Sequence, residues 1–380
     1  MKKLRNIMLT FVAVLSLLLL NITGVNAQQN SSSATANTSV TGKLKVHFIN
    51  VGQADSILIQ QGNENMLIDA GNNDDENTIK NYLASLGVKE LKYAIATHPH
   101  EDHIGSMDYI MNSLKVGQIY APKVTTTTKT YENLVNAVKN KGMQFKVPTV
   151  GETFYVGQAK CTILAPNSSA YDELNNYSIV VKVEFGNNSF LFTGDAEEVS
   201  EKEMLSKGLN LKADFIKVGH HGSRSSSSDA FLNAVNPRYA VISVGKNNDY
   251  GHPNTDTLSR LSSRGTIVYR TDLNGTVVAT SDGNNIIFNC NPAVGSTNIT
   301  YTTNINNSNS NNSLVVNTQN NNNDTTINQL EDKNRTVYVS RNDGKVYHYD
   351  KTCSGLKNPN EMTLEEAQNE GLRACSKCAK

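Results

Sequence analysis

THPHEDH, residues 97–103, holds four groups that can bind a metal ion in a very short stretch of chain. It follows a buried strand predicted over residues 93–97, and Pro99 disfavours helix at its start. Imidazole and carboxylate are ligands of zinc and its first-row neighbours. Such a strand-to-helix turn can direct several side chains into one space and supply ligands for two metal ions. The four groups are His98, His100, Asp102 and His103.

Most of the other histidines lie in two further stretches that also follow predicted strands. GHHG, residues 219–222, follows the strand predicted over 215–218, and YGHP, residues 250–253, comes after the strand predicted over 239–244. His47 differs because it lies within a strand, and we interpret it as structural.

The composition limits the classes of protein to which the chain can belong. The 380 residues include 35 Lys+Arg and 35 Asp+Glu, and 38% of them are hydrophobic. This excludes a polytopic membrane protein and a protein that holds nucleic acid by net charge alone. Shifts in composition predict five segments. They are a signal peptide (1–27), a disordered leader (28–42), a large domain (43–290), an Asn/Ser/Thr-rich linker (291–334) and a small Cys/His module (335–380).

The N-terminus has the pattern of a secretory signal peptide. Basic residues precede the apolar run at 7–20, and the small-residue site VNA follows at 25–27. The apolar run is shorter than the ~20 residues that a spanning helix needs, although an uncleaved anchor is the alternative. We expect cleavage to leave no stable membrane span and the mature protein to be secreted, extracellular or associated with the cell surface.

Alternating strands and helices over residues 43–290 predict an α/β domain with two sheets covered by helices on their outer faces. The predicted strands are 43–49, 56–59, 66–69, 93–97, 160–164, 178–185, 189–192, 215–218, 239–244 and 266–269. The predicted helices are 77–86, 103–114, 131–141, 197–206, 229–235 and 256–263.

The order of the motifs resembles that of the metallo-β-lactamase superfamily. The motifs are LIDAG (67–71), HPHEDH (98–103), FTGD (192–195) and GHHG (219–222). NVGQADS (50–56) and YGHP narrow the resemblance to the soluble metallo-hydrolase domain of ComEC-type DNA-uptake (competence) proteins. The resemblance spans about residues 43–290 and implies a metallo-β-lactamase fold, a four-layer αβ/βα sandwich. Those channels carry many membrane helices, so this chain looks like a free secreted relative.

The resemblance also implies roles for single residues. Asp195 would bridge two divalent metal ions, zinc or manganese, which generate hydroxide near neutral pH. His98 and His100 would hold the first ion. Asp102, His103 and one of the pair His220 and His221 would hold the second, with His221 favoured. Asp102, His220 and His252 are the expected catalytic groups, with His220 on the transferred oxyanion.

Further residues are expected around the metals. Asp69 would orient a ligand imidazole, or it is a turn carboxylate at a strand end. The superfamily usually has another histidine where this chain has Asn175, which is either an oxygen ligand or a turn residue. An oxygen-richer site suits manganese. Ser223 and Arg224 are expected to contact a substrate phosphate, with a flexible serine loop as the alternative, and His252 is expected to contact the phosphate or the metal centre. Lys217 and Lys246 would complete a basic patch with Arg224.

The tail resembles the small YHxxxC…CxxC zinc modules related to the Ada-type metal-binding fold. A C-x-x-C pair with two more ligands gives a tetrahedral Cys₃His site for a structural zinc. The expected ligands are His348, Cys353, Cys375 and Cys378. A disulfide is the alternative in an exported protein. Attachment to the cell surface through this module is a further expectation.

Three classes of function remain open. The first is a secreted metal-dependent phosphodiesterase or nuclease acting on extracellular DNA. The second is a hydrolase of a small ester, such as a phosphocholine ester or a lactone. The third is a protein that binds DNA or cell wall and whose metal site is incidental.

Overall fold

The computed structural model describes residues 40–293 and, in the tail, 336–340, 346–349, 351, 353, 356, 359–370 and 372–375. These residues belong to two compact units, divided between positions 301 and 302. The signal peptide predicted over 1–27, most of the predicted leader and linker, and Cys378 lie outside the described residues.

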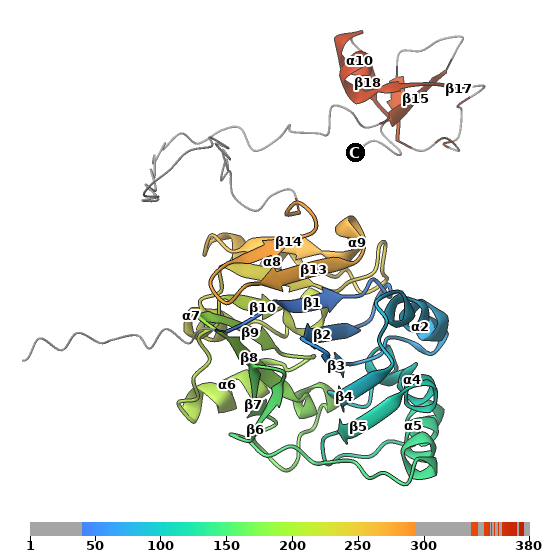
Figure 1. Ribbon diagram of the computed structural model, residues 1–380. Coiled ribbons are helices and arrows are strands. Elements are labelled where there is room, and N and C mark those ends of the chain that lie inside the picture. Colours follow the sequence, from blue (N-terminus) through green and yellow to red (C-terminus); the bar gives the residue numbers. More distant parts are fainter. Residues whose placement is uncertain are drawn as a thin grey trace, which may run out of the picture. The chain divides into compact units, whose positions relative to one another are not determined.

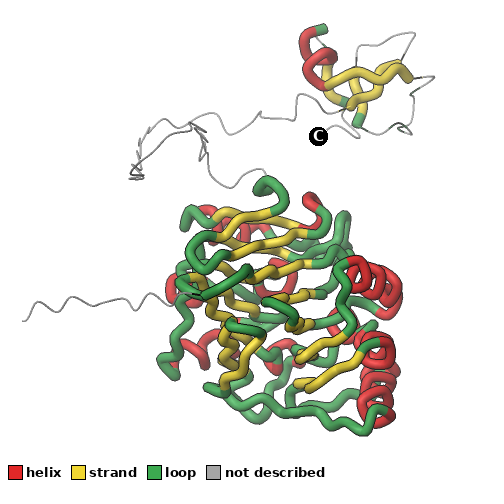
Figure 2. The backbone as a smooth tube through the Cα atoms, viewed as in Figure 1, coloured by secondary structure: helices red, strands yellow, loops and turns green. Residues whose placement is uncertain are grey.

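Two seven-stranded sheets form the first unit (Figures 1 and 2). The first sheet has the order β14 (Ile286–Phe288), β13 (Val277–Ser281), β1 (Leu44–Phe48), β2 (Ile57–Gln61), β3 (Glu64–Ile68), β4 (Glu90–Ile95) and β5 (Lys115–Tyr120). The second has the order β12 (Ile267–Arg270), β11 (Tyr239–Ile242), β10 (Phe215–Lys217), β9 (Asn188–Phe192), β8 (Val180–Phe185), β7 (Ala159–Ala165) and β6 (Thr153–Val156).

Helices cover the outer face of each sheet (Figure 1). On the first sheet they are α2 (Glu76–Ser85), α4 (Met107–Ser113) and α5 (Lys129–Asn140), and on the second α6 (Glu198–Ser206), α7 (Asp229–Val235) and α8 (Thr255–Ser262). Short helical pieces complete the unit: η1 (Asn73–Asp75), α3 (Glu101–Ile104), η2 (Leu174–Tyr177), η3 (Gly219–Gly222) and α9 (Thr271–Asn274). The predicted four-layer αβ/βα sandwich is confirmed.

Each layer boundary has its own apolar core. Between the sheets the ring of Phe48 lies 6.3 Å from that of Phe192 and 5.4 Å from that of Phe215. Two further cores lie under the helices, for example around Leu83 of α2 and Phe231 of α7. Inner strands such as β8 and β10 are buried on both faces, so they read as largely apolar runs in the sequence.

Each sheet has a run of parallel strands at one end, and this positions the site. β3, β4 and β5 run parallel in the first sheet, and β9, β10, β11 and β12 run parallel in the second. Parallel strands end at the same edge of a sheet, where ligands bind in open α/β folds. LIDAG, HPHEDH, FTGD, GHHG and YGHP lie at or after the ends of these parallel strands, and NVGQADS follows β1.

Two details differ from the sequence prediction. The helix predicted over 103–114 is broken, because the amides of Gly105 and Ser106 donate to the carbonyls of Gly71 and Ala70. Strands β5, β6, β13 and β14 were not predicted. β13 extends the first sheet by pairing with β1. This partner is more than 200 residues away in the chain, and no local pattern reveals it.

The tail unit contains a four-stranded sheet of the order β17 (Pro359–Thr363), β15 (Thr336–Ser340), β16 (Val346–His348) and β18 (Arg373–Ala374), with helix α10 (Leu364–Asn369). Its small core includes Val337, Tyr347 and Leu364. Among the described residues of the whole chain, no helix combines the length and apolarity needed to cross a membrane.

His47 provides a test of the fold through pH. Its side chain is 3% exposed, and its Nδ1 lies 2.9 Å from the hydroxyl of Tyr82. Burial, with Lys45 nearby, lowers the pKa of His47 to about 4. Between about pH 6.5 and pH 4 the unfolded chain therefore binds more protons than the folded one, so stability is lost as pH falls through this window.

We expect His47→Gln to remove this loss, which is on the order of 3 kcal/mol for a shift of this size. Urea denaturation at pH 7 and pH 4.5 should show a smaller fall in the free energy of unfolding for the variant than for the wild type. Equal falls in both proteins would show that His47 does not titrate in this way.

Candidate metal centre

Four side chains from three strand ends converge on one point. They are Asp102 and His103 after β4, Asp195 after β9 and His221 after β10, and one ligand atom of each lies within 4.8 Å of all the others. His103 and Asp195 lie beside each other, with Nε2 3.2 Å from Oδ2, and His221 Nε2 lies 3.2 Å from Asp102 Oδ2. Ligands of one tetrahedral zinc ion are separated by about 3.3–3.6 Å, given metal–ligand bonds of about 2.0–2.2 Å.

The two imidazoles of the cluster can each offer Nε2 to a cation, because their Nδ1 atoms are already hydrogen-bonded. The Nδ1–H of His103 donates to Asp69 over 2.8 Å, and that of His221 donates to the carbonyl of Ser243 over 2.9 Å. Each imidazole therefore turns its Nε2 lone pair toward the cluster. His103 Nε2 and Asp195 Oδ1 are buried without a hydrogen-bond partner, as expected of groups that would hold a metal. The residues present fit a divalent ion.

The electrostatics agree with this fit. Burial alone would raise the pKa of Asp195, but His103 and His221 hold it well below its usual range. Burial alone would lower the pKa of His103, but Asp195, Asp102 and Asp69 raise it well above its usual range. A divalent ion would take the place of the proton that these carboxylates favour on His103.

The backbone is strained where it supplies these groups. Asp69, His220 and His221 have φ of 58°, 50° and 51°, in the left-handed region that non-glycine residues rarely adopt. Gly194 has φ 51°, and a Cβ there would lie 3.1 Å from both Thr97 and Ser178. The tight turn at Gly194 places the Asp195 carboxylate in the cluster.

His98 and His100 form a second pair beside the first cluster. His98 Nε2 lies 3.0 Å from His100 Nδ1, and Nδ1 of the buried His98 is within 3.3 Å of the Ser178 hydroxyl. The same hydroxyl accepts the amide of Asp195 over 3.0 Å. Ser178 thus links both halves of the site. Asn175 Oδ1, buried and without a partner, is an available oxygen at the cavity wall.

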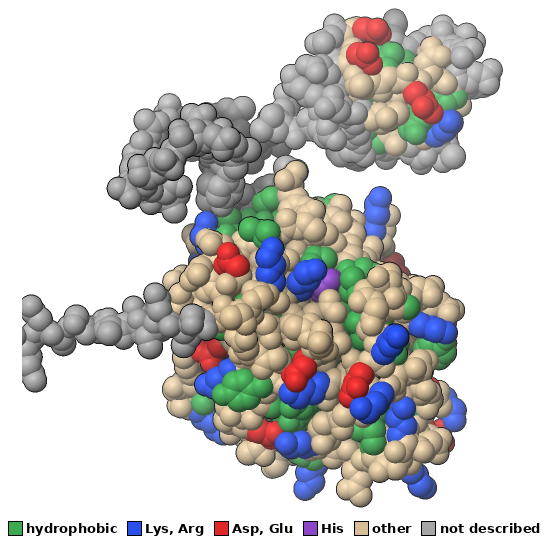
Figure 3. Space-filling model, in the orientation of Figure 1, with side chains coloured by type: hydrophobic (Ala, Val, Ile, Leu, Met, Phe, Trp, Pro, Cys, Tyr) green, Lys and Arg blue, Asp and Glu red, His purple; other side chains and the backbone are tan. Residues whose placement is uncertain are grey.

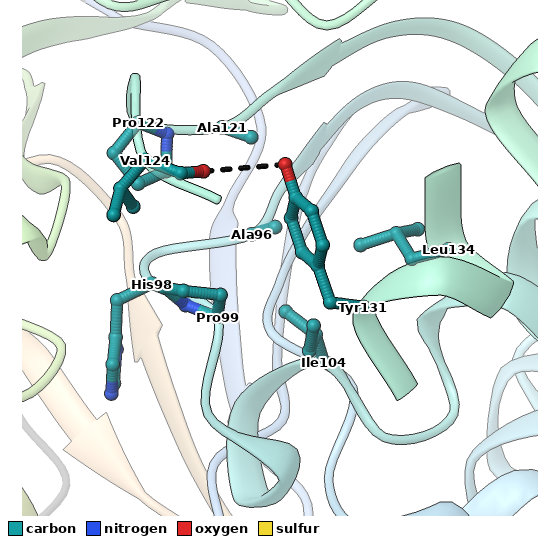
Figure 4. Close-up of a pocket in the computed structure, with 9 residues that line it drawn as sticks. All are labelled: Ala96, His98, Pro99, Ile104, Ala121, Pro122, Val124, Tyr131 and Leu134. Carbon is teal, nitrogen blue, oxygen red and sulfur yellow. Dashed lines mark hydrogen bonds between the residues drawn. The ribbon is translucent and has the colours of Figure 1, made fainter. Parts of the chain in front are cut away.

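The loop that carries His98 rests on packed side chains (Figure 4). The pocket behind His98 and Pro99 holds only about 10 Å³, and the Tyr131 hydroxyl closes one side by donating to the Val124 carbonyl over 3.2 Å. Such a space admits no more than about one water molecule. The imidazole of His98 therefore has little room to retreat from the site.

The cluster opens into a polar cavity of about 320 Å³. Its lining residues are Gln53, His100, Glu101, Asp102, Asn175, Asp195, His220, His221, Tyr250 and His252. Burial, with His220 and His221 nearby, lowers the pKa of His252 to about 4, so its imidazole is neutral at pH 7. A neutral imidazole can donate a hydrogen bond to a substrate oxygen.

His220 differs from His221 in its surroundings. It is 25% exposed at the cavity, its Nε2 is 3.7 Å from Asp195 Oδ2, and its Nδ1 is 3.3 Å from Glu197 Oε1. Glu197 also accepts from the hydroxyl of Ser225 over 2.8 Å. Sequence analysis did not identify Glu197 as a functional residue, although it lies only two residues after Asp195.

Several expected contacts are arranged differently. Arg224 pairs with Asp256 over 2.9 Å and lines a neighbouring groove of about 590 Å³ instead of the cavity. The Ser223 hydroxyl contacts that of Ser225 over 3.0 Å, and it is Ser225 that reaches His220. The expectation that Lys217 belongs to a surface patch is wrong. Its side chain is fully buried and pairs with Asp55.

The surface charge is mixed. On the face that Figure 3 shows, basic and acidic side chains are interspersed over the first unit. This agrees with equal numbers of basic and acidic residues in the sequence. The face in Figure 3 therefore carries no broad positive field.

The tail unit holds a separate group of possible ligands. His348, Cys353 and Cys375 each place one ligand atom within 4.8 Å of the others. The two sulfur atoms are 3.8 Å apart. That separation suits two thiolates on one zinc ion, with bonds of about 2.3 Å, and is far longer than a disulfide bond.

Comparisons of the chain with known proteins identify its family and several relatives. A model of the metallo-beta-lactamase superfamily matches residues 49–246. The chain is 32% identical over 253 residues to ComE operon protein 3 of Bacillus subtilis, covering 61% of this chain and 32% of that protein. It is 31% identical over 230 residues to competence protein ComA of Neisseria gonorrhoeae, covering 59% of this chain and 30% of that protein.

The chain thus spans about a third of the length of these curated relatives. Among solved structures, the metallo-beta-lactamase fold protein YhfI of Bacillus subtilis is similar, with a TM-score of 0.44 and 12% identity over 63% of this chain and 100% of that one.

Proposed function

This chain belongs to the metallo-beta-lactamase superfamily, and we therefore propose that it is a metal-dependent phosphodiesterase that cleaves DNA outside the cell. The observation that carries this proposal is the convergence of Asp102, His103, Asp195 and His221 at the floor of an open polar cavity. The name of one curated relative, competence protein ComA, supports DNA as the substrate.

We assign the metal ligands from the geometry of the site. Asp102, His103, Asp195 and His221 would hold one divalent ion. His98 and His100 would hold another with Asp195 and the Asn175 oxygen, which makes zinc or manganese suitable. When bound, such ions supply Lewis acidity and activate water for attack on a phosphodiester.

The other residues would orient these ligands and the substrate. Asp69 accepts from both His103 and Thr97, so it fixes the ring of His103. Glu197 holds Nδ1 of His220 and leaves Nε2 directed into the cavity, where it can donate to a phosphate oxygen. His252, neutral at pH 7, would serve as a second donor. These donors match an anion that gains negative charge during the reaction.

For the tail we propose a structural zinc held by His348, Cys353, Cys375 and Cys378. The 3.8 Å separation of the Cys353 and Cys375 sulfur atoms supports it. A module with so small a core gains most of its stability from such a metal.

The experiment that tests the function uses the purified full chain, stripped with a chelator and reloaded with Mn²⁺ or Zn²⁺. We expect cleavage of DNA only in the presence of the ion, and no cleavage after chelation. His47→Gln, a buried histidine outside the cavity, is the matched control and should retain turnover at pH 7.

The same preparations should be given RNA, a phosphocholine ester, a lactone and a β-lactam. Turnover of a small ester or lactone, with DNA left intact in both metals, would contradict the proposal. Binding of DNA with no hydrolysis of any substrate would also contradict it and favour a binding protein.

A further inference from the structure

We propose that Tyr250 is a stacking platform for a nucleobase beside the scissile phosphodiester, so that the substrate is single-stranded nucleic acid. This inference rests on the proposed phosphodiesterase function and specifies its substrate class. A base inside a duplex has both faces covered, whereas a base in a single strand can stack on an aromatic side chain.

Tyr250 presents its ring to solvent at the mouth of the site. It lines the cavity above the metal ligands and its side chain is 73% exposed, the largest exposed fraction among the exposed large hydrophobic side chains of the described residues. One face of the ring lies against His252, with centroids 5.8 Å apart and an interplanar angle of 24°. Because Tyr250 is otherwise largely exposed, a planar ligand has ring surface to stack on.

A series of rings connects Tyr250 with the reaction centre. The ring of His252 lies 5.6 Å from that of His220, and His220 Nε2 lies 3.7 Å from Asp195 Oδ2. These separations place Tyr250 close enough to contact the base of a nucleotide that flanks a phosphate held by His220. His220 would hold the phosphate and Tyr250 the base, so the two contacts act on different parts of one nucleotide.

The loop that carries Tyr250 is fixed before substrate binds. Oδ1 of Asn248 accepts the amides of Tyr250 and His252 over 3.2 and 3.0 Å, and its Nδ2 donates to the carbonyls of Gly245 and His252. Gln53 accepts the amide of Gly245 over 2.9 Å and so ties the loop to the cavity wall. A preorganised platform loses little conformational entropy when a base stacks on it.

The arrangement favours a nucleobase over a choline cation. Recognition of a quaternary ammonium group uses a cage of several aromatic rings. Among the described cavity-lining residues, Tyr250 is the sole tyrosine or phenylalanine, and the other rings are imidazoles. One open aromatic plane suits a flat base that needs only one stacking face.

The test compares Tyr250→Leu and Tyr250→Phe with the wild type, in the metal-loaded full chain. Tyr155→Leu, which removes another exposed tyrosine (50% exposed) on β6, is the control. Each protein receives a single-stranded oligodeoxynucleotide, the same sequence as a duplex, and an oligonucleotide of equal length made of abasic nucleotides. The measured quantities are kcat and KM.

We expect Tyr250→Leu to lower kcat/KM on the base-bearing single strand by about tenfold, mainly through KM, as loss of one base–aromatic stack implies. Tyr250→Phe and Tyr155→Leu should stay within about twofold of the wild type. On abasic strands all four proteins should be equally slow. The wild type should also prefer the single strand to the duplex.

Equal losses for Tyr250→Leu on abasic and base-bearing strands would overturn the inference, because they would indicate a role in loop structure. No loss on either strand would overturn it as well, and in both cases the nuclease function would stand. If the wild type cleaves no oligonucleotide but hydrolyses a phosphocholine ester, the proposed function itself fails.

Discussion

Asp195→Asn should reduce hydrolysis by a factor of about 10³ or more and strip metal from the first unit. The side chain is 1% exposed, and its Oδ2 lies 3.2 Å from His103 Nε2 and 3.7 Å from His221 Nε2. Asparagine keeps the shape of the side chain but removes the negative charge that two cations would share. Affinity for both ions should therefore fall together.

The measurements are turnover of DNA and metal content by mass spectrometry of the dialysed protein. Metal bound by the tail should remain, because its ligands belong to the other unit. The control is Asp229→Asn, which alters an exposed carboxylate paired with Arg264. Unchanged metal content and turnover in Asp195→Asn would contradict the assignment of two ions.

Lys217→Met should destabilise the fold by about 3–5 kcal/mol, because it leaves a buried carboxylate without its counter-charge. Lys217 Nζ pairs with Asp55, donates to the Gly194 carbonyl over 3.2 Å and lies 3.7 Å from Asp195 Oδ1. Burial alone would lower the pKa of Lys217, but Asp55 and Asp195 raise it, so the side chain is charged. Asp55 is 1% exposed and cannot be solvated by water instead.

Urea denaturation of chelated protein measures this loss. The double variant Lys217→Met/Asp55→Asn should regain much of the stability, because the two charges are removed together. Lys182→Met is the matched control. Lys182 is a second buried lysine, but its carboxylate neighbour Glu184 is 37% exposed at a distance of 3.9 Å and can be solvated. Additive losses for Lys217 and Asp55 would show that the pair is not coupled.

The pair of Lys217 and Asp55 also lies next to the candidate metal centre. Gly194 and Asp195 follow β9, and Lys217 is the last residue of the neighbouring strand β10. Its ammonium group therefore lies under the turn that carries Asp195. A loss of stability in Lys217→Met and a loss of metal in Asp195→Asn would arise from adjacent parts of one buried charge cluster.

Much of the fold followed from local patterns. The alternation of apolar strands and amphipathic helices predicted two helix-covered sheets, and helix α7 was predicted at its observed limits, Asp229–Val235. The motif residues were found because they are dense in chemistry and lie directly after apolar strands. Local sequence carries these signals because hydrophobic periodicity and strand-end motifs depend on neighbours within a few positions.

The site followed only in part. His98, His100, Asp102, His103, Asp195 and His221 were all named from sequence, and the structure brings the last four together. Glu197, which contacts His220, was not named, and Gln53 and Tyr250, which line the cavity, were quoted only as members of NVGQADS and YGHP with no role of their own. Glutamate, glutamine and tyrosine are common on protein surfaces, so a motif can mark the stretch but does not show which of its side chains line the cavity.

The sequence by itself determined which groups can bind metal, the α/β class and the order of the motifs along the chain. The tertiary structure alone decided that Lys217 is buried beside Asp55, that Arg224 faces a different groove, and that β13 pairs with β1. Contacts of this kind join residues far apart in the chain, and their energies depend on burial and on partner charges. Both quantities are set only when the sheets pack together.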